Sequence, residues 1–512
     1  MRERLKAKPA KVVCENLYLP AIEADSARSF NNMNLLNMAH VLMLEHQHII
    51  GHDSAVHILN GLETMAEEGP DSIGRDPMRE DYYFNVEKRL IDLVGMNDGG
   101  KMHTARSRND LNATIARMNT RDCLLEVGRL ILSLRGELLR LAKDNCDTIV
   151  TGYTHMQPAQ PITFAHYFSA IAEAVERDYD RILSSFERLN LSPLGAGAFA
   201  GTSFPIDREY TANRLGFTGI LENTLDAVAS RDYMLEIAGD FATLGSTLSR
   251  FANDLYCWAT DEFHYIEVDD SLAVCSSIMP QKKNPITLEH VKSKSSHLAA
   301  AYVSIFTCLR GAAYGHARDV AGESPHLFWD AAHEMIVILK LLCATLQTLV
   351  IRKDNAARRV NDNFCTVTEL ADYLVVKQDI SFRVAHQIVG KIVGDCLDAG
   401  LTCSRIDGNM VRKAVKVFTD QEPDITDEEV KEVLGGEHSV KKRVSAGSPM
   451  PENVRLVIGE LEEKLRKDRV HMDEMKTGIS QAFERLAKDM EVMTGRKQHG
   501  IVKEWNTAVS SD

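Results

Sequence analysis

The chain has 512 residues, of which 44% are apolar and 26% are charged, so it can hold more than one domain and is not disordered as a whole. Its formal net charge is -14, which argues against nucleic acid and anionic membrane surfaces as partners. An acidic ligand would therefore need a local cationic pocket.

The N-terminal stretch MRERLKAKPAKVVCENLYLP is basic but lacks the continuous apolar core of a secretory signal. The most apolar later segment, VILKLLCATLQTLVI, contains Lys340 and Gln347 and is shorter than the roughly 20 residues that a membrane helix needs. Ten cysteines are scattered without a CxxC pair, which favours reduced thiols. We expect a soluble, cytoplasmic protein, with a short organellar targeting segment as the alternative.

Several long segments carry apolar residues at spacings of three and four, the pattern of helices that pack on other helices. Such stripes begin near residues 127, 164, 234, 291 and 335, and the clearest consists of Met234, Ile237, Phe241, Leu244, Leu248, Phe251, Leu255 and Trp258. A helix of about 30 residues is roughly 45 Å long, so these segments must pack as a bundle. Because strand patterns are rare, the predicted class is all-α, and so much apolar helix surface favours assembly of several chains.

The helices look shorter before residue 115, and a new pattern of short helices begins after residue 365 with TVTELADYLV. We therefore expect three domains: an N-terminal helical domain over residues 1–115, a central long-helix bundle over 116–365 and a C-terminal helical domain over 366–512.

Three separated segments are rich in groups that bind anions or move protons. The first, GGKMHTARSRND, contains Lys101, His103, Thr104, Arg106, Ser107, Arg108 and Asn109. The second, TGYTHMQPAQP, contains Thr154, His155 and Gln157. The third, SSIMPQKKNP, contains Ser276, Ser277, Lys283 and Asn284.

Each segment taken alone also fits a structural role. The first fits a solvated loop or helix cap, the second a capped helix start, and the third a surface turn. Together they supply hydroxyl, amide and cationic donors, almost no carboxylates and no metal-ligand set. Arginine and lysine match carboxylate charge, and serine, threonine and asparagine add aimed hydrogen bonds. The sequence therefore predicts a pocket for a small molecule that bears carboxylates, with no metal or organic cofactor.

These segments resemble the argininosuccinate lyase family within the aspartase and fumarase superfamily. SSIMPQKKNP fits the signature GSSxMPxKxN, with Cys275 in place of the usual glycine. The segments GGKMHTARSRND, GYTHMQPAQP, SPLGAGAFAGTSFPIDR, LDAVASRDYMLE and TVTELADYLV follow the family order over about residues 80 to 390. The resemblance implies an all-α homotetramer whose active sites are each shared by three subunits, and a reaction that releases fumarate from an N-substituted aspartate.

The resemblance also implies roles for the site residues. Ser277 would be the general base, on a loop of about residues 270 to 285 that closes over the substrate, and Lys283 and Asn284 would hold the carboxylate that becomes an aci-carboxylate. His155, polarised by Glu289 of another subunit, would be the acid or proton relay. The expected substrate-binding residues are Ser107, Arg108, Asn109, Thr154, Gln157, Asn284, Ser276 and Tyr314, with Arg231 and Gln157 equally open to a structural role.

The chain departs from argininosuccinate lyases after the signature. Where they usually carry a pattern like YNxDxQEDK, this chain has YGHARDVAGESPHLFWD, which places Ala321 and Ser324 at the glutamine and lysine positions. Ala105 and Leu111 also stand where glycine and glutamine are common. The fumarate-forming half therefore looks intact and the amine-binding half altered. The open alternatives are argininosuccinate, another N-substituted aspartate such as ethylenediamine disuccinate, and a catalytically silent, crystallin-like structural tetramer.

Overall fold

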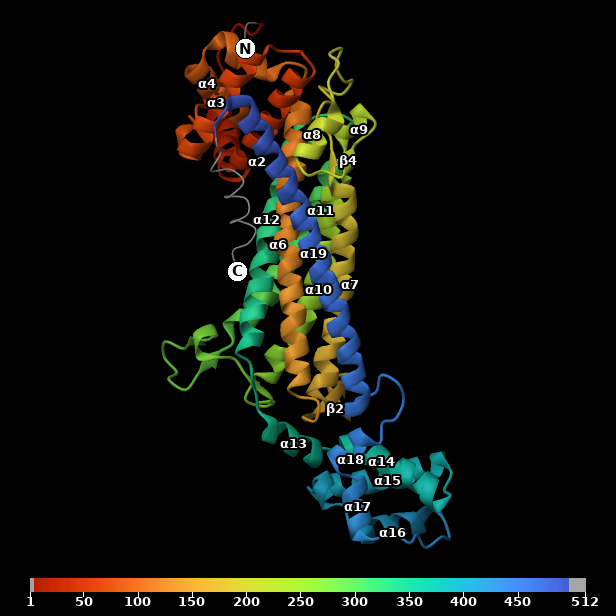
Figure 1. The fold of residues 1–512 in the computed structure, drawn as a ribbon. Helices are drawn as coiled ribbons and strands as arrows, with labels where there is room; N and C mark the ends of the chain where they lie inside the picture. The colour runs from red at the N-terminus through yellow and green to blue at the C-terminus, as the bar shows by residue number, and fades with distance from the viewer. Residues whose placement is uncertain (1–3, 497–512) are drawn as a thin grey trace.

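Six long helices form a bundle that runs along the molecule in the computed structural model, which describes residues 4–496 (Figure 1). They are α6 (Arg108–Lys143), α7 (Phe164–Leu189), α10 (Asp232–Trp258), α11 (Ile286–Arg310), α12 (Ser324–Gln347) and α19 (Pro451–Thr494). The all-α prediction is confirmed. No helix among the described residues is long and apolar enough to cross a membrane.

The predicted apolar stripes form the core of this bundle. The eight residues of the stripe that begins at Met234 are all buried on α10. Helix α10 packs against α11 and α7, and α6 packs against α7, α12 and α19. Because each fully buried side chain of this size contributes roughly 1.5 to 3 kcal/mol, the stripes are sufficient to hold the long helices together.

The N-terminal part packs around the first end of α6. Its helices are α1 (Lys11–Val13), α2 (Leu19–His46), α3 (His52–Glu68), α4 (Tyr82–Val94) and α5 (Met96–Gly99). Helix α2 has 28 residues, so the expectation of shorter helices before residue 115 was wrong for this element. Its buried face includes Asn32, Asn34 and Asn37, and these amides interrupt the apolar stripe in the sequence.

Short connecting elements lie at the two ends of the bundle. Helices α8 (Arg208–Arg214) and α9 (Thr224–Ala229) lie at one end, and strands β1 (Ile149–Thr154) and β2 (Gln157–Thr163) lie at the other (Figure 1). The remaining two-stranded pairs join β3 (Leu191–Ser192) to β4 (Gly219–Ile220), β5 (Ile266–Glu267) to β8 (Val350–Ile351), and β6 (Val274–Cys275) to β7 (Lys283–Asn284).

The C-terminal helices form a second apolar core around Leu370, Leu374, Ile388, Ile392 and Val411. The helices of this core are α14 (Val367–Gln378), α15 (Phe382–Asp398), α16 (Gly408–Phe418) and α17 (Asp427–Val433). Helices α13 (Lys353–Asp362) and α18 (Gly436–Lys441) contribute Val360 and Val440 to a separate small cluster with Ile149 and Cys365. Helix α19 then returns along the bundle for 44 residues and contributes to the main core. The three-domain division at residues 115 and 365 stays a prediction.

Candidate active site

The first predicted segment ends at the N-terminus of α6. Ser107 is the N-cap of this helix: its hydroxyl accepts from the Asn109 backbone N–H, and its own backbone N–H donates to Asp110 at 2.9 Å. The second Asp110 oxygen accepts from the backbone of Gly195 and Gly197. This capping box satisfies the first helical N–H groups and fixes Ser107, Arg108 and Asn109 at the positive end of a 36-residue helix.

The residues just before Ser107 contact the N-terminal helices and stabilise the start of α6. Arg106 is buried and donates to Asn37 at 2.7 Å, and His103 lies 2.8 Å from the Tyr83 hydroxyl. Burial, Arg106 and Arg108 lower the pKa of His103 to about 4, so this ring is neutral near pH 7.

Two further residues of the segment also contact the protein itself. Lys101 donates to the Ser54 hydroxyl at 2.7 Å, and the Thr104 carbonyl lies 2.8 Å from a ring nitrogen of His40. Lys101 and Thr104 therefore stabilise the conformation of the segment before α6.

Arg108 is already partly neutralised. Its guanidinium donates to Asp81 at 2.6 Å and stacks over the Phe84 ring. Asn109 donates to the carbonyl of Ala198 at 3.0 Å, which ties the helix start to the glycine-rich loop before α8.

Three titratable side chains that the sequence did not assign to the site, Asp25, His316 and Arg318, lie at this end. Burial lowers the pKa of His316, and the charges of Arg231, Arg318 and Arg108 lower it further. Burial raises the pKa of Asp25 to about 6, against the opposing effects of Arg28 and Arg318. The sequence offered no signal for this grouping, because these residues are far apart in the chain.

Arg231 and Tyr314 have partners at the same end. Arg231 is 4% exposed and donates to the carbonyl of Ser230 at 2.6 Å, and its Nε is buried with no hydrogen-bond partner among residues 4–496. Tyr314 donates to Asp226 of α9, which fixes the segment after α11 against this end of the bundle.

The second predicted segment is the turn between β1 and β2, and the expectation of a capped helix start here was wrong. Thr154 pairs with Gln157, and His155 and Met156 form the turn with φ values of 53° and 58°. Two central residues with positive φ are the signature of a type I′ hairpin turn. Thr154, His155 and Gln157 are exposed, so all three side chains are available to a ligand.

The third predicted segment closes the hairpin between β6 and β7. The Ser276 hydroxyl accepts from the backbone of Ile278 and Met279 at 3.3 and 3.0 Å. Ser277 is exposed, and its hydroxyl makes no hydrogen bond within the described part of the chain. Asn284 pairs with Val274 in the hairpin, and Glu289 is exposed in the first turn of α11.

The three segments do not meet within one chain. The first lies at the start of α6, and the hairpin that carries Thr154 follows its other end, so 36 residues of helix, about 54 Å, separate them. The third segment lies at the hairpin end, since Tyr265 before it is 2.7 Å from Tyr153 of β1. A single chain therefore gives Ser277 no access to the donors around Ser107.

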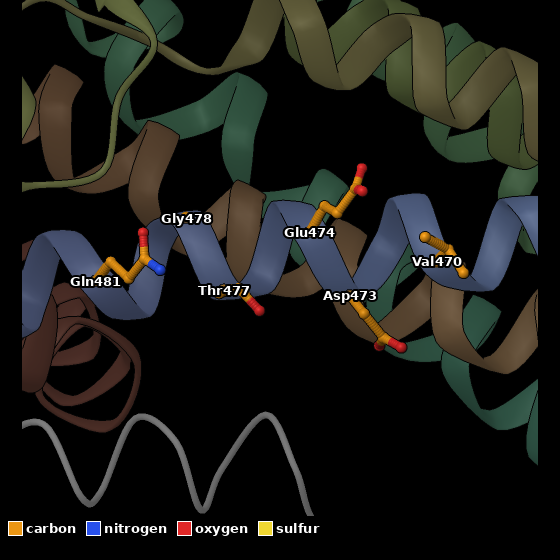
Figure 2. Close-up of a pocket in the computed structure, with 6 residues that line it drawn as sticks. All are labelled: Val470, Asp473, Glu474, Thr477, Gly478 and Gln481. Atoms are coloured by element: carbon orange, nitrogen blue, oxygen red, sulfur yellow. The ribbon is translucent and has the colours of Figure 1, made fainter.

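A hollow of about 360 Å³ lies on the outer side of α19 and is lined by Val470, Asp473, Glu474, Thr477, Gly478 and Gln481. Figure 2 shows the Glu474 and Asp473 side chains pointing to opposite sides of the helix. It contains none of the predicted site residues. Among residues 4–496 we find no group of three or more side chains that could hold a metal ion.

The chain matches two family models. One, described as lyase, matches residues 22–299, and the other, described as argininosuccinate lyase C-terminal, matches residues 364–441. Argininosuccinate lyase 1 of Shouchella clausii (strain KSM-K16) is 41% identical over 95% of this chain and 99% of its own length. The argininosuccinate lyase of Methanosarcina mazei is 38% identical over 93% of this chain and 95% of its own length.

Solved structures of related lyases also resemble this chain over nearly its whole length. An EDDS lyase in complex with formate superimposes with a TM-score of 0.84 at 30% identity, over 96% of this chain and 97% of that chain. A variant of EDDS lyase with bound fumarate gives a TM-score of 0.83, also at 30% identity and with the same coverage.

Proposed function

The chain belongs to the argininosuccinate lyase family, and we propose that it is a carbon-nitrogen lyase that eliminates fumarate from an N-substituted aspartate. The observation that carries this proposal is the presence of all three donor segments, at the N-terminus of α6, at the β1–β2 turn and on the β6–β7 hairpin. In the parent reaction, argininosuccinate yields arginine and fumarate.

The proposed reaction begins with proton removal from C3 of the succinyl group. Ser277 takes this proton as an alkoxide, stabilised by nearby cations and backbone amides, and becomes a neutral hydroxyl. The electron pair moves into the neighbouring carboxylate to give an aci-carboxylate. Lys283 and Asn284 hold this dianion, since donors aimed at developing charge lower the barrier. The C2–N bond then breaks with its electrons leaving on nitrogen, which His155 protonates, and the C2=C3 double bond of fumarate forms.

The other predicted residues bind the substrate. Arg108, Asn109, Ser107 and Thr154 orient the succinyl carboxylates, and the N-terminus of α6 adds favourable positive potential. Glu289 of a neighbouring subunit polarises His155. Ser276, Gln157 and Tyr314 are the weaker assignments, because Ser276 shapes its own turn and Tyr314 is engaged by Asp226.

Because about 54 Å separates the ends of α6, we propose a homotetramer in which each active site takes one segment from each of three subunits. The chemistry needs no metal or organic cofactor, since side-chain cations and amides supply the required charge. We place the protein in the cytoplasm, where its ten free cysteines would stay reduced.

A second candidate substrate is an aminopolycarboxylate such as ethylenediamine disuccinate. The 30% identity to EDDS lyase over 96% of this chain favours it. The segment after α11 supports it too, because it carries Ala321 and Ser324 where argininosuccinate lyases usually have glutamine and lysine.

The test runs the purified protein in the addition direction. Fumarate is supplied with arginine, ethylenediamine, simple amino acids or ammonia, and its consumption is followed by ultraviolet absorbance. Addition to arginine alone identifies an argininosuccinate lyase. Addition to ethylenediamine or amino acids identifies the second substrate class, and no addition to any amine contradicts the lyase proposal.

A further inference from the structure

Lys283, which the proposed mechanism assigns to the substrate carboxylate, is engaged by two carboxylates of its own chain. Its ammonium donates to Glu267 at 3.0 Å and lies 2.6 Å from Asp270. Both acids precede the β6–β7 hairpin in the chain, and Lys283 lies in β7. The ion pairs therefore join the last strand of the hairpin to the segment that leads into it.

The two carboxylates are not equivalent. Glu267 is shared, because it also pairs with Arg352, and its side chain is 34% exposed. The Asp270 side chain is 93% exposed, and Lys283 is its ion-pair partner. Asp270 is therefore the carboxylate that can leave Lys283 with little rearrangement, while Glu267 stays anchored.

The same acids would repel a dicarboxylate. A substrate carboxylate brought to Lys283 meets the like charges of Asp270 and Glu267, with Asp269 beside them in the chain. Like charges at hydrogen-bond distance disfavour each other, and because Asp270 is exposed to solvent this repulsion is modest. Lys283 thus cannot keep Asp270 and fully engage the substrate at the same time.

We propose that Asp270 is a positioning residue that pairs with Lys283 and is displaced from it by the substrate carboxylate. This rests on the proposed function, which makes Lys283 a substrate-binding residue. The exchange couples dicarboxylate binding to the β6–β7 hairpin that carries Ser277. Asp270 thereby weakens binding of any dicarboxylate and leaves the chemical step unchanged.

The test compares wild type with Asp270→Asn, and Asp261→Asn serves as the matched control. Asp261 is an exposed acid of the same segment that does not pair with Lys283, so the control removes the same charge without opening the contact. Fumarate affinity is measured by calorimetry, and KM and kcat in the elimination direction. Because exposed ion pairs are weak, Asp270→Asn should lower the fumarate Kd and KM about two- to fivefold, with kcat unchanged.

The dependence of fumarate affinity on salt concentration is the second measurement. Since the competing contact is exposed, the ratio of wild-type to Asp270→Asn affinity should approach one at high ionic strength. An unchanged or raised Kd in Asp270→Asn overturns the inference, as does an equal gain in Asp261→Asn or a fall in kcat alone. If fumarate binds but no amine is converted, the proposed function is contradicted, and the fumarate Kd of Asp270→Asn still decides this inference. If fumarate does not bind, both the proposed function and this inference are contradicted.

Discussion

Ser107 and Thr154 stand beyond opposite ends of helix α6, whose 36 residues span about 54 Å. Ser107 caps the first turn, and Thr154 lies in the hairpin that follows the last one. Two groups that the mechanism assigns to one substrate are therefore held far apart by a rigid element. In the proposed homotetramer, other copies of the chain would supply the missing group without any bending of the helix.

This separation predicts complementation between two inactive variants. Asn109→Ala removes a donor at the start of α6, and Ser277→Ala removes the base on the β6–β7 hairpin. Each homo-oligomer should lose activity. Mixed oligomers contain some sites in which both segments are wild type, so randomly mixed subunits should recover about a quarter of wild-type activity. Activity is measured after joint refolding or co-expression, and a mixture that stays as inactive as its parents would show that one chain supplies both groups.

A buried ion-pair network predicts a large effect on stability. Arg135 of α6 is 1% exposed and pairs with Asp468 of α19 at 2.5 Å and Glu176 of α7 at 2.8 Å. Arg135→Ala leaves the buried Asp468 carboxylate without this partner, which should cost about 3 to 5 kcal/mol. Thermal unfolding of this variant is compared with Arg140→Ala on the same helix. This change removes exposed pairs with Glu137 and Asp144 and a hydrogen bond to the Leu346 carbonyl, and it should cost about 1 to 2 kcal/mol. Equal decreases in Tm for the two variants would contradict the larger energetic contribution assigned to the buried pair.

Asp25 of α2 predicts a pH-dependent stability. Its pKa is raised from 3.8 to about 6 because burial outweighs the attraction of Arg28 and Arg318, and Asp81 adds repulsion. A carboxyl with a raised folded-state pKa binds its proton more tightly when folded. The fold therefore loses stability as pH rises from 3.8 towards 6.

Replacing Asp25 with asparagine removes this loss of folding stability at higher pH. The Tm of Asp25→Asn should equal that of wild type near the unfolded-state pKa of 3.8 and exceed it once the pH is above 6. Glu23→Gln, an exposed position on the same helix, is the control and should show no such pH dependence. A constant difference in Tm at every pH would contradict the assigned pKa shift.

The sequence predicted those parts of the structure that depend on local patterns. The stripe from Met234 to Trp258 gave the buried face of α10, because every third or fourth residue is apolar and faces the neighbouring helices. It did not predict the length of α2. Buried Asn32 donates to Asn119 and Asp122 at 2.7 and 2.9 Å, so polar residues occupy core positions on that helix.

Two features of the site depend on tertiary structure or rare backbone conformations. The β1–β2 turn uses positive φ at His155 and Met156, where glycine or asparagine would have signalled a hairpin. The grouping of Asp25, His316 and Arg318 arises only when α2 and the segment after α11 pack at the same end. The residue assignments within the three donor segments remain predictions.

The most direct test of the central claim is the addition reaction in deuterated water, followed by proton NMR. Wild-type protein with fumarate and an accepted amine should form an N-substituted aspartate carrying one deuterium at C3. The deuterium and nitrogen should lie on opposite faces of the former double bond, because the reverse reaction is an anti elimination. Ser277→Ala should form no product. The proposed mechanism is contradicted if no amine consumes fumarate, or if Ser277→Ala forms the deuterated product as fast as wild type.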